Sequence, residues 1–260
     1  MPNLLQFDPS QFLGFFVIFT RMSGLMLSAP VLGDGNIPML VRVLFTYVLS
    51  LLFFPVVAAP QVGPDPGLLP LTLLLMSELG VGLLMGFAAR ILFEGVQLAG
   101  EVIGFQMGLG IAHVVDPTSQ LQIPLIGQVQ SVFALFLFVV LDGHHMLIRA
   151  LAGSYEVLGV GAVNWGEPAL QFYSGLLGRL FFIGLQIGAP LTVALLAANF
   201  AMGLIARSVP QVNIFIVGFP FTIGLGLLFL ALGFPFFIEA LVMLIERIEG
   251  VIFTGLQVLR

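Results

Sequence analysis

Residues 208–238 read SVPQVNIFIVGFPFTIGLGLLFLALGFPFFI, without a single charged side chain. A helix crosses a bilayer with about 20 apolar residues, so this stretch is long enough to span. Three further charge-free windows cover residues 43–64, 117–141 and 180–206. Over the whole chain 8% of residues are charged, against roughly 25% in an ordinary soluble domain. The sequence therefore predicts a polytopic, helical membrane protein.

Glycine and proline are frequent inside these apolar stretches. The chain has 31 glycines and 16 prolines in 260 residues. Pro190 lies within an apolar run, and Gly218-Phe219-Pro220 and Gly233-Phe234-Pro235 interrupt the last one. Backbone that is not helical occurs in apolar surroundings only where protein or water supplies its hydrogen bonds. We therefore expect an all-α fold of Gly/Pro-broken, tightly packed helical hairpins, in a single domain over residues 1–260.

Composition also excludes several function classes. The net charge is −5, all eight basic residues are scattered arginines, and cysteine is absent. No basic stripe is available to neutralise phosphates, which argues against a nucleic-acid partner. The chain has no His-Glu-x-x-His element, and Val31-Leu32-Gly33-Asp34 misses the Gly-x-Gly-Asp pattern of intramembrane proteases at its first residue. We expect no enzymatic activity, no cofactor and no metal.

Residues 94–115 are predicted to form a helix that packs closely against protein. Gly100, Gly104 and Gly108 recur every fourth residue, which clears one stripe of side chains so that another backbone can approach. Glu94 and Glu101 are seven residues apart and share a face. The stripe is therefore assigned to helix packing.

Charged side chains in or beside apolar segments leave two interpretations open. An unpaired charge there is costly, so it faces a partner or a water-filled path. One interpretation is a polar conduit or an intersubunit contact, and the other is an internal ion pair or a side chain that reaches the helix end. Arg90 and Glu94, four residues apart, are spaced to pair. The residues concerned are Arg21, Arg42, Glu78, Arg90, Glu94 and Glu101.

A polar, methionine-containing segment separates two apolar regions. Gln106 and Met107 precede it, and Asp116-Pro117 and Pro124 bound its central part. Flexible polar and thioether side chains suit the lining or closing of a passage. The residues alone equally fit an ordinary interhelical loop.

Three stretches together resemble one known family. They are residues 21–42, which begin RMSGLMLSAP; residues 94–117, with Gly100-Glu101, Gln106-Met107-Gly108 and Asp116-Pro117; and residues 199–220, with Pro-Gln-Val-Asn-Ile-Phe from Pro210 and Gly218-Phe219-Pro220. All three are similar to the FliR export-gate family of flagellar type III secretion, which is also represented in injectisomes. The resemblance covers nearly the whole chain.

The resemblance implies a role in protein export rather than in small-molecule transport. It implies that FliP-like and FliQ-like subunits, with a FlhB-like subunit, join this chain in the flagellar basal body of the inner membrane, among membrane lipid. Unfolded flagellar proteins would pass through the pore. Residues 106–123 would form a plug loop that closes this pore. The plug role falls on Gln106, Met107, Gly108, His113, Asp116, Pro117, Gln120 and Gln122.

The resemblance also implies that Pro210, Gln211 and Asn213 belong to a turn between packed helices. An injectisome export gate is the nearest alternative, since the two branches are alike at this level. Pro-Gln-Val-Asn-Ile-Phe favours the flagellar branch. A secondary transporter is a further alternative, although it predicts matching interruptions in two halves, and the Pro-Gly interruptions gather in the C-terminal third.

Overall fold

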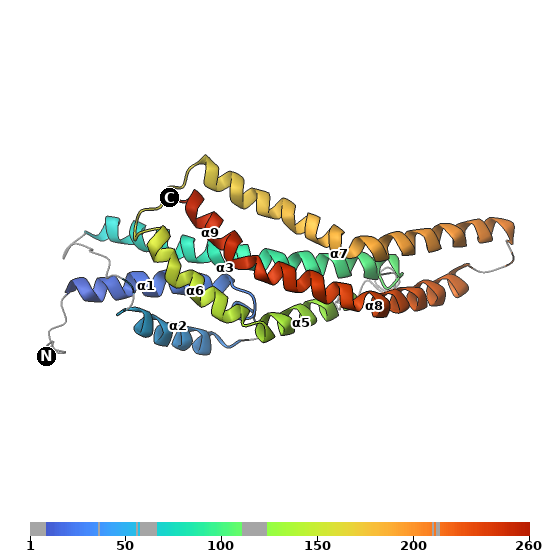
Figure 1. Ribbon diagram of the computed structural model, residues 1–260, viewed down its shortest axis with the longest axis horizontal. Helices are drawn as coiled ribbons and strands as arrows, with labels where there is room; N and C mark the ends of the chain where they lie inside the picture. Colours follow the sequence, from blue (N-terminus) through green and yellow to red (C-terminus); the bar gives the residue numbers. More distant parts are fainter. Residues whose placement is uncertain are drawn as a thin grey trace. The chain divides into compact units, whose positions relative to one another are not determined.

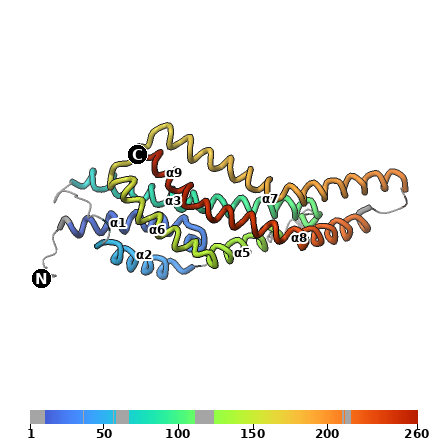
Figure 2. Tube along the Cα trace, in the orientation of Figure 1, coloured from blue at the N-terminus to red at the C-terminus, as the bar shows by residue number. Residues whose placement is uncertain are grey.

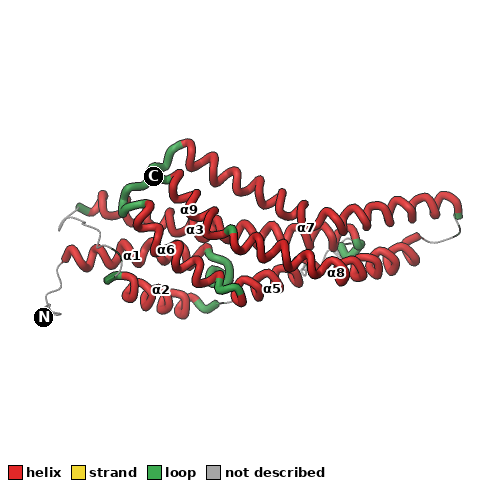
Figure 3. Tube along the Cα trace, in the orientation of Figure 1, coloured by secondary structure: helices red, strands yellow, loops and turns green. Residues whose placement is uncertain are grey.

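The computed structural model describes residues 9–35, 37–55, 57, 67–110, 124–209, 211 and 214–260. Every regular element in these ranges is an α-helix (Figure 3). The helices, drawn in Figure 1, are α1 (Pro9–Ser28), α2 (Met39–Phe53), α3 (Leu68–Gln106), α5 (Leu125–Val140), α6 (Gly143–Val157), α7 (Glu167–Ser208), α8 (Ile214–Glu246) and α9 (Ile248–Val258).

Four described stretches are long and apolar enough to cross a membrane. They are Gln11–Ser28, Leu68–Gln106, Glu167–Ser208 and Ile216–Val258, and α5 with α6 makes a fifth when the pair is counted as one broken span. Many large apolar side chains of these helices are exposed, as on the outer faces of α7 and α8. The protein is therefore an all-α, polytopic membrane protein, as the sequence predicts.

Two helices are longer than a bilayer requires. α3 has 39 residues and α7 has 42, which at about 1.5 Å per residue gives lengths of about 58 and 63 Å. The hydrocarbon layer is about 30 Å thick, and tilts reach only about 40°. Part of each helix must therefore lie outside the hydrocarbon or against protein.

Several predicted interruptions are absent from the helices. The helix predicted over residues 94–115 does not begin at residue 94 but continues from α3, which starts at Leu68, and Pro190, Pro220 and Pro235 all lie inside helices. In apolar surroundings a helix is the conformation that satisfies nearly every backbone group, so it persists through a proline. The predicted end at Val115 also differs, because α3 ends at Gln106.

The contacts divide the chain into two compact units. Unit 1 comprises Met1–Ile91, Asp142–Leu176 and Arg247–Arg260. Within it, α1 lies beside α2 and α6 lies beside α9, which can be followed along the trace in Figure 2. Phe15 of α1 makes edge contacts with Tyr47 and Phe54. Aromatic side chains thus fill the space between α1 and the region of α2.

Close backbone approach joins α1 to the first half of α3. A Cβ atom at Gly82 would collide with the carbonyl oxygen of Arg21, and one at Gly24 would collide with that of Leu79. One turn further along α3, a Cβ atom at Gly86 would collide with Ser28 Oγ and would lie 2.7 Å from the backbone nitrogen of Ala29. These glycines let the two helices touch backbone to backbone.

Unit 2 comprises Leu92–Leu141 and Leu177–Glu246. It contains the second half of α3 with α5, most of α7, and α8. One core cluster gathers Val96, Ala134 and Leu241, with Phe237 packed against it. Gly95 of α3 contacts Ile183 of α7, and Gly184 contacts Leu98. The C-terminal half of α3 is therefore the central helix of this unit.

Candidate functional site at the C-terminal end of helix α3

α3 ends in a capping motif centred on Gly108. The amide of Leu109 donates to the carbonyl of Gly104 at 3.1 Å, and the amide of Gly108 donates to that of Phe105 at 3.0 Å. Gly108 has a φ of 86°, in the left-handed region that glycine adopts without strain. This pair of bonds with a left-handed glycine is the Schellman motif. The chain thus leaves α3 in a defined direction.

The motif includes its usual apolar contact. Leu109 packs on a buried cluster that contains Ile103, Met107, Ile126, Leu191 and Leu195. These residues come from the end of α3, from α5 and from α7. We call Gln106–Gly110 the loop root, because the segment predicted to plug the pore continues from it.

Met107 is the fully buried anchor of the loop root. Its side chain has no exposed surface and fills a notch on α8 at Gly226. A Cβ atom at Gly226 would lie 2.6 Å from Met107 Cγ and 2.7 Å from Sδ. Only a glycine at position 226 leaves room for Met107 in this position.

Two helices also bond to the last carbonyls of α3. Thr222 Oγ1 on α8 donates to the carbonyl of Met107 at 3.0 Å, and Asn199 Nδ2 on α7 donates to that of Gln106 at 3.4 Å. Helix C-termini leave carbonyls without intrahelical donors, so these side chains satisfy groups that would otherwise be unpaired. The loop root is therefore tied to both α7 and α8.

A second glycine contact fixes the same point. A Cβ atom at Gly108 would lie 2.6 Å from Cδ1 of Phe219 on α8. Any other residue at position 108 would meet both this ring and an unfavourable φ. Gly108 is thus required by the cap and by α8.

The other two glycines of the predicted stripe face α5. At Gly100 a Cβ atom would lie 2.5 Å from Cα of Gly127, whereas at Gly104 it would make an ordinary contact of 3.6 Å with Ile126. The structure places Gly100 at a backbone contact and Gly104 beside it, while Gly108 lies beyond the end of the helix. Gly100 thus permits close packing against α5, whereas Gly108 ends the helix.

The remaining candidate plug residues, His113, Asp116, Pro117, Gln120 and Gln122, lie outside the described residues, as do Pro210 and Asn213 of the predicted turn. Gln211, the described residue of that turn, is exposed between α7 and α8. The described part of the candidate site is therefore the loop root and the helices that hold it.

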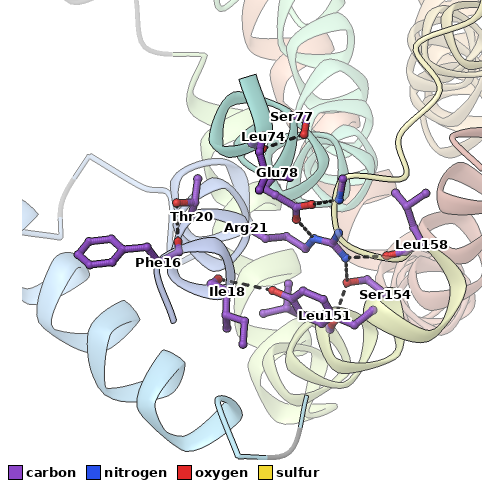
Figure 4. A network of polar contacts seen from close by, with 12 residues as sticks. Phe16, Ile18, Thr20, Arg21, Leu74, Ser77, Glu78, Leu151, Ser154 and Leu158 are labelled. Atoms are coloured by element: carbon purple, nitrogen blue, oxygen red, sulfur yellow. Dashed lines mark hydrogen bonds and ion pairs between the residues drawn. The ribbon is translucent and has the colours of Figure 1, made fainter. Parts of the chain in front are cut away.

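In unit 1, a buried ion pair connects three segments (Figure 4). Arg21 Nε on α1 lies 2.6 Å from Glu78 Oε2 on α3, and neither side chain is exposed. Arg21 Nη1 donates to Ser154 Oγ at 3.0 Å and to the carbonyl of Leu158 at 3.2 Å. The amide of Gly161 donates to the other carboxylate oxygen of Glu78 at 2.9 Å. The pair thus joins α1 and α3 to α6 and the segment after it.

An aromatic ring completes the surroundings of Arg21. The guanidinium carbon lies 4.2 Å from the centroid of the Tyr155 ring, within the range of cation–π attraction. For Arg21, of the two interpretations left open by the sequence, these contacts favour the internal ion pair.

The other charged candidates also have partners. Arg42 Nη2, on α2, donates to the carbonyl of Asp34 at 2.6 Å. This hydrogen bond joins α2 to the segment that follows α1. Glu101 Oε1 accepts a hydrogen bond of 3.0 Å from Gln97 Nε2 within α3. Arg90, which is exposed, and Glu94, which is half-buried, each have an interaction partner.

The acid and histidines at the start of α6 interact locally. His145 Nδ1 lies 3.1 Å from Asp142 Oδ1, and the rings of His144 and His145 are 4.1 Å apart. Their ligand atoms are close enough to approach one cation, but His145 and Asp142 are largely exposed. Nothing else in the described residues gathers around them, so we assign them no chemistry.

Sequence reasoning singled out Arg21 and Glu78 as charges in apolar segments, but it missed the residues that hold the loop root and the other partners of Arg21. Thr222 and Asn199 lie about a hundred residues from the carbonyls they bind, and Ser154 lies 133 residues from Arg21. A hydroxyl within a charge-free run, as at Thr222, was the available signal. Which carbonyl it would reach depends on tertiary structure.

These helices, long, apolar and packed closely at glycines, define an integral membrane protein with close helix contacts. The chain belongs to the family described as bacterial export proteins, family 1, whose model matches residues 12–248. The resemblance stated from the sequence is confirmed.

Curated relatives extend this result. The flagellar biosynthetic protein FliR of Bacillus subtilis (strain 168) is 32% identical over 223 residues, which are 84% of this chain and 85% of that protein. FliR of Escherichia coli (strain K12) is 31% identical over 236 residues, 89% and 90% of the two chains. FliR of Caulobacter vibrioides is 30% identical over 84% of this chain and 86% of its own. The chain is a membrane-embedded component of flagellar protein export.

Replacing Arg21 with methionine should strongly destabilise unit 1. The change leaves the buried carboxylate of Glu78 without its counter-charge, which costs about 3–5 kcal/mol. The double variant Arg21→Met/Glu78→Met removes both charges and should be more stable than Arg21→Met alone. Thermal unfolding of the purified chain in detergent, followed by the fluorescence of the single tryptophan, measures the stability of both variants.

Arg149→Met, at an exposed position, is the control. Equal losses of stability for Arg149→Met and Arg21→Met would contradict the assignment.

Gly226→Ala should loosen the loop root, whereas Gly224→Ala should not. The new methyl group at position 226 displaces Met107, at a cost of about 1–3 kcal/mol. Position 224 has nothing within 4 Å of a Cβ atom, so alanine there gains about 0.5–1 kcal/mol from its helix propensity. The midpoints of thermal unfolding should move in opposite directions. A fall for both variants, or for neither, would show that Met107 does not occupy the notch.

Proposed function

We propose that this chain forms, with FliP-like and FliQ-like subunits and beside a FlhB-like subunit, the export pore in the inner membrane at the flagellar basal body. Unfolded flagellar proteins are its substrates. Residues 106–123 act as a plug loop that closes the pore before export. The observation that carries the proposal is the anchoring of the loop root, where a predicted moving segment begins from a fixed point.

The geometry of the loop root supports a gate that works without chemistry. Met107 and Gly108 are held by Gly226, Thr222 and Phe219 of α8. A loop that must close a pore and reopen needs one end that does not shift, because otherwise the closed position would not be reproducible. The energy for export then comes from the ATPase and the proton motive force, acting through other subunits.

The contacts of the loop root also relate opening of the plug loop to the positions of α7 and α8. α7 and α8 both bond to the last carbonyls of α3. A displacement of either helix by a passing substrate or by a neighbouring subunit would strain these bonds. We infer that the plug loop responds to the positions of α7 and α8, which provide its mechanical coupling.

Deletion of Thr118–Ile123 should make the assembled gate leak ions. The shortened loop cannot fill the pore, while the loop root and the packing of unit 2 remain. Ion leak is measured with a membrane-potential dye in cells that contain the complete export apparatus, together with co-purification of the FliP-like and FliQ-like subunits. Leak should rise severalfold with assembly unchanged.

Deletion of residues 60–65, between α2 and α3, is a control of the same length. It should leave the ion barrier intact. An assembled gate that lacks residues 118–123 and still holds back ions would overturn the plug assignment.

A further inference from the structure

One exposed carboxylate lies within the apolar outer face of α8. Glu239 is exposed and has no hydrogen-bonding or ionic partner in the part of the chain that the structure describes. The same helix face carries Leu228, Leu232, Phe236 and Met243, whose side chains are 55%, 64%, 73% and 52% exposed. Steps of four, four, three and four residues keep all five on one side of a helix. We call them the α8 stripe.

The α8 stripe needs a cover that tolerates a negative charge. Its apolar members require lipid or protein around them. Phe236 and Met243 flank Glu239 on both sides, so lipid over the whole stripe would bring the carboxylate into hydrocarbon, where charged groups are rare and almost always paired. Glutamate also lacks the long stem with which lysine or arginine reaches the interface. Protein with a hydrogen-bond donor is the better cover.

The neighbourhood of the stripe fits a close helix contact. Gly224 lies one turn before Leu228, and a Cβ atom there would have nothing within 4 Å. Small residues at such positions let another helix approach to backbone distance. A lipid-facing surface gains nothing from this open space.

The chain carries more carboxylates than cations. The protein has 13 acidic and 8 basic residues. Among the basic ones, Arg21 is committed to Glu78, Arg42 to the carbonyl of Asp34, and Arg90 has a partner. The chain is therefore short of cations for its own carboxylates.

We propose that the α8 stripe is the docking surface for an apolar helix of another subunit of the export apparatus, and that this helix carries a lysine or arginine at the level of Glu239. The inference rests on the proposed function, because it takes the partner from the same assembly. The basic side chain pairs with Glu239, and the apolar residues on either side exclude water from the pair. The charge selects the partner and fixes its register along α8.

Charge reversal tests the pairing in the complete apparatus. Glu239→Arg should reduce the amount of FliP-like and FliQ-like subunits co-purified with this chain by tenfold or more and should abolish motility. Glu239→Gln, which keeps a hydrogen-bonding side chain, should retain part of the assembly. The matched control is Glu156→Arg, at an exposed position of α6 in unit 1, which should assemble normally. Unfolding of the purified variants, followed by tryptophan fluorescence, establishes that each is folded.

A suppressor selection identifies the partner. Motility of Glu239→Arg cells should be restored by a Lys→Glu or Arg→Glu change in an apolar helix of another subunit. Restoration only by a change within this chain, such as Arg179→Glu, would overturn the proposal in favour of a second copy or an internal contact. Normal assembly of Glu239→Leu would also overturn it, since lipid would then suffice as the cover.

Failure of this inference is distinguishable from failure of the proposed function. If the unaltered chain co-purifies with the FliP-like and FliQ-like subunits and the loop deletion leaks, but Glu239→Arg assembles normally, the docking surface alone is rejected. If the unaltered chain does not assemble with them, the proposed function is rejected as well.

Discussion

A buried guanidinium needs a counter-charge and acceptors from the protein around it, and in unit 1 this requirement brings α1, α3 and α6 together. Arg21 has no exposed surface and lies against Glu78, Ser154 and the Tyr155 ring. Removing two charges from water is costly, and only good geometry offsets that cost. The position of α1 along α3 and α6 is therefore closely constrained. The glycine contacts follow from it, since Gly82 touches the carbonyl of Arg21 itself.

The loop root obeys the same constraint without charges. The last carbonyls of α3 need donors, and in apolar surroundings Thr222 and Asn199 supply them. Met107 reaches its notch because position 226 is a glycine, and the chain turns at Gly108 because its φ is positive. Both units thus combine a polar group satisfied across a long sequence separation with a glycine that permits the approach. Such contacts fix the position of α1 in unit 1 and the end of α3 in unit 2.

The sequence predicted the class of the protein well because class depends on composition. Charge-free windows require helices, and most predicted segments are helices. The ends and breaks were predicted less well: the interruption predicted at Gly218-Phe219-Pro220 lies within α8, since the apolar surroundings favour the helix. The glycine stripe pointed to the right region, but its last member caps α3 instead of packing within it. The partners of Arg21 and Met107 could not be predicted, because they depend on contacts between segments far apart in the chain.

Helix length connects these local observations to assembly. α3 and α7 are each about twice as long as the hydrocarbon layer is thick. Their apolar surface, and that of α8, therefore exceeds what lipid alone can cover, so the long charge-free windows need not all face lipid. The excess must lie outside the hydrocarbon or against protein. A carboxylate within such a surface, as at Glu239, is tolerable only where the covering chain provides a donor. Helix length, exposed apolar area and the isolated charge at Glu239 thus all support the protein contacts that we propose for the α8 stripe.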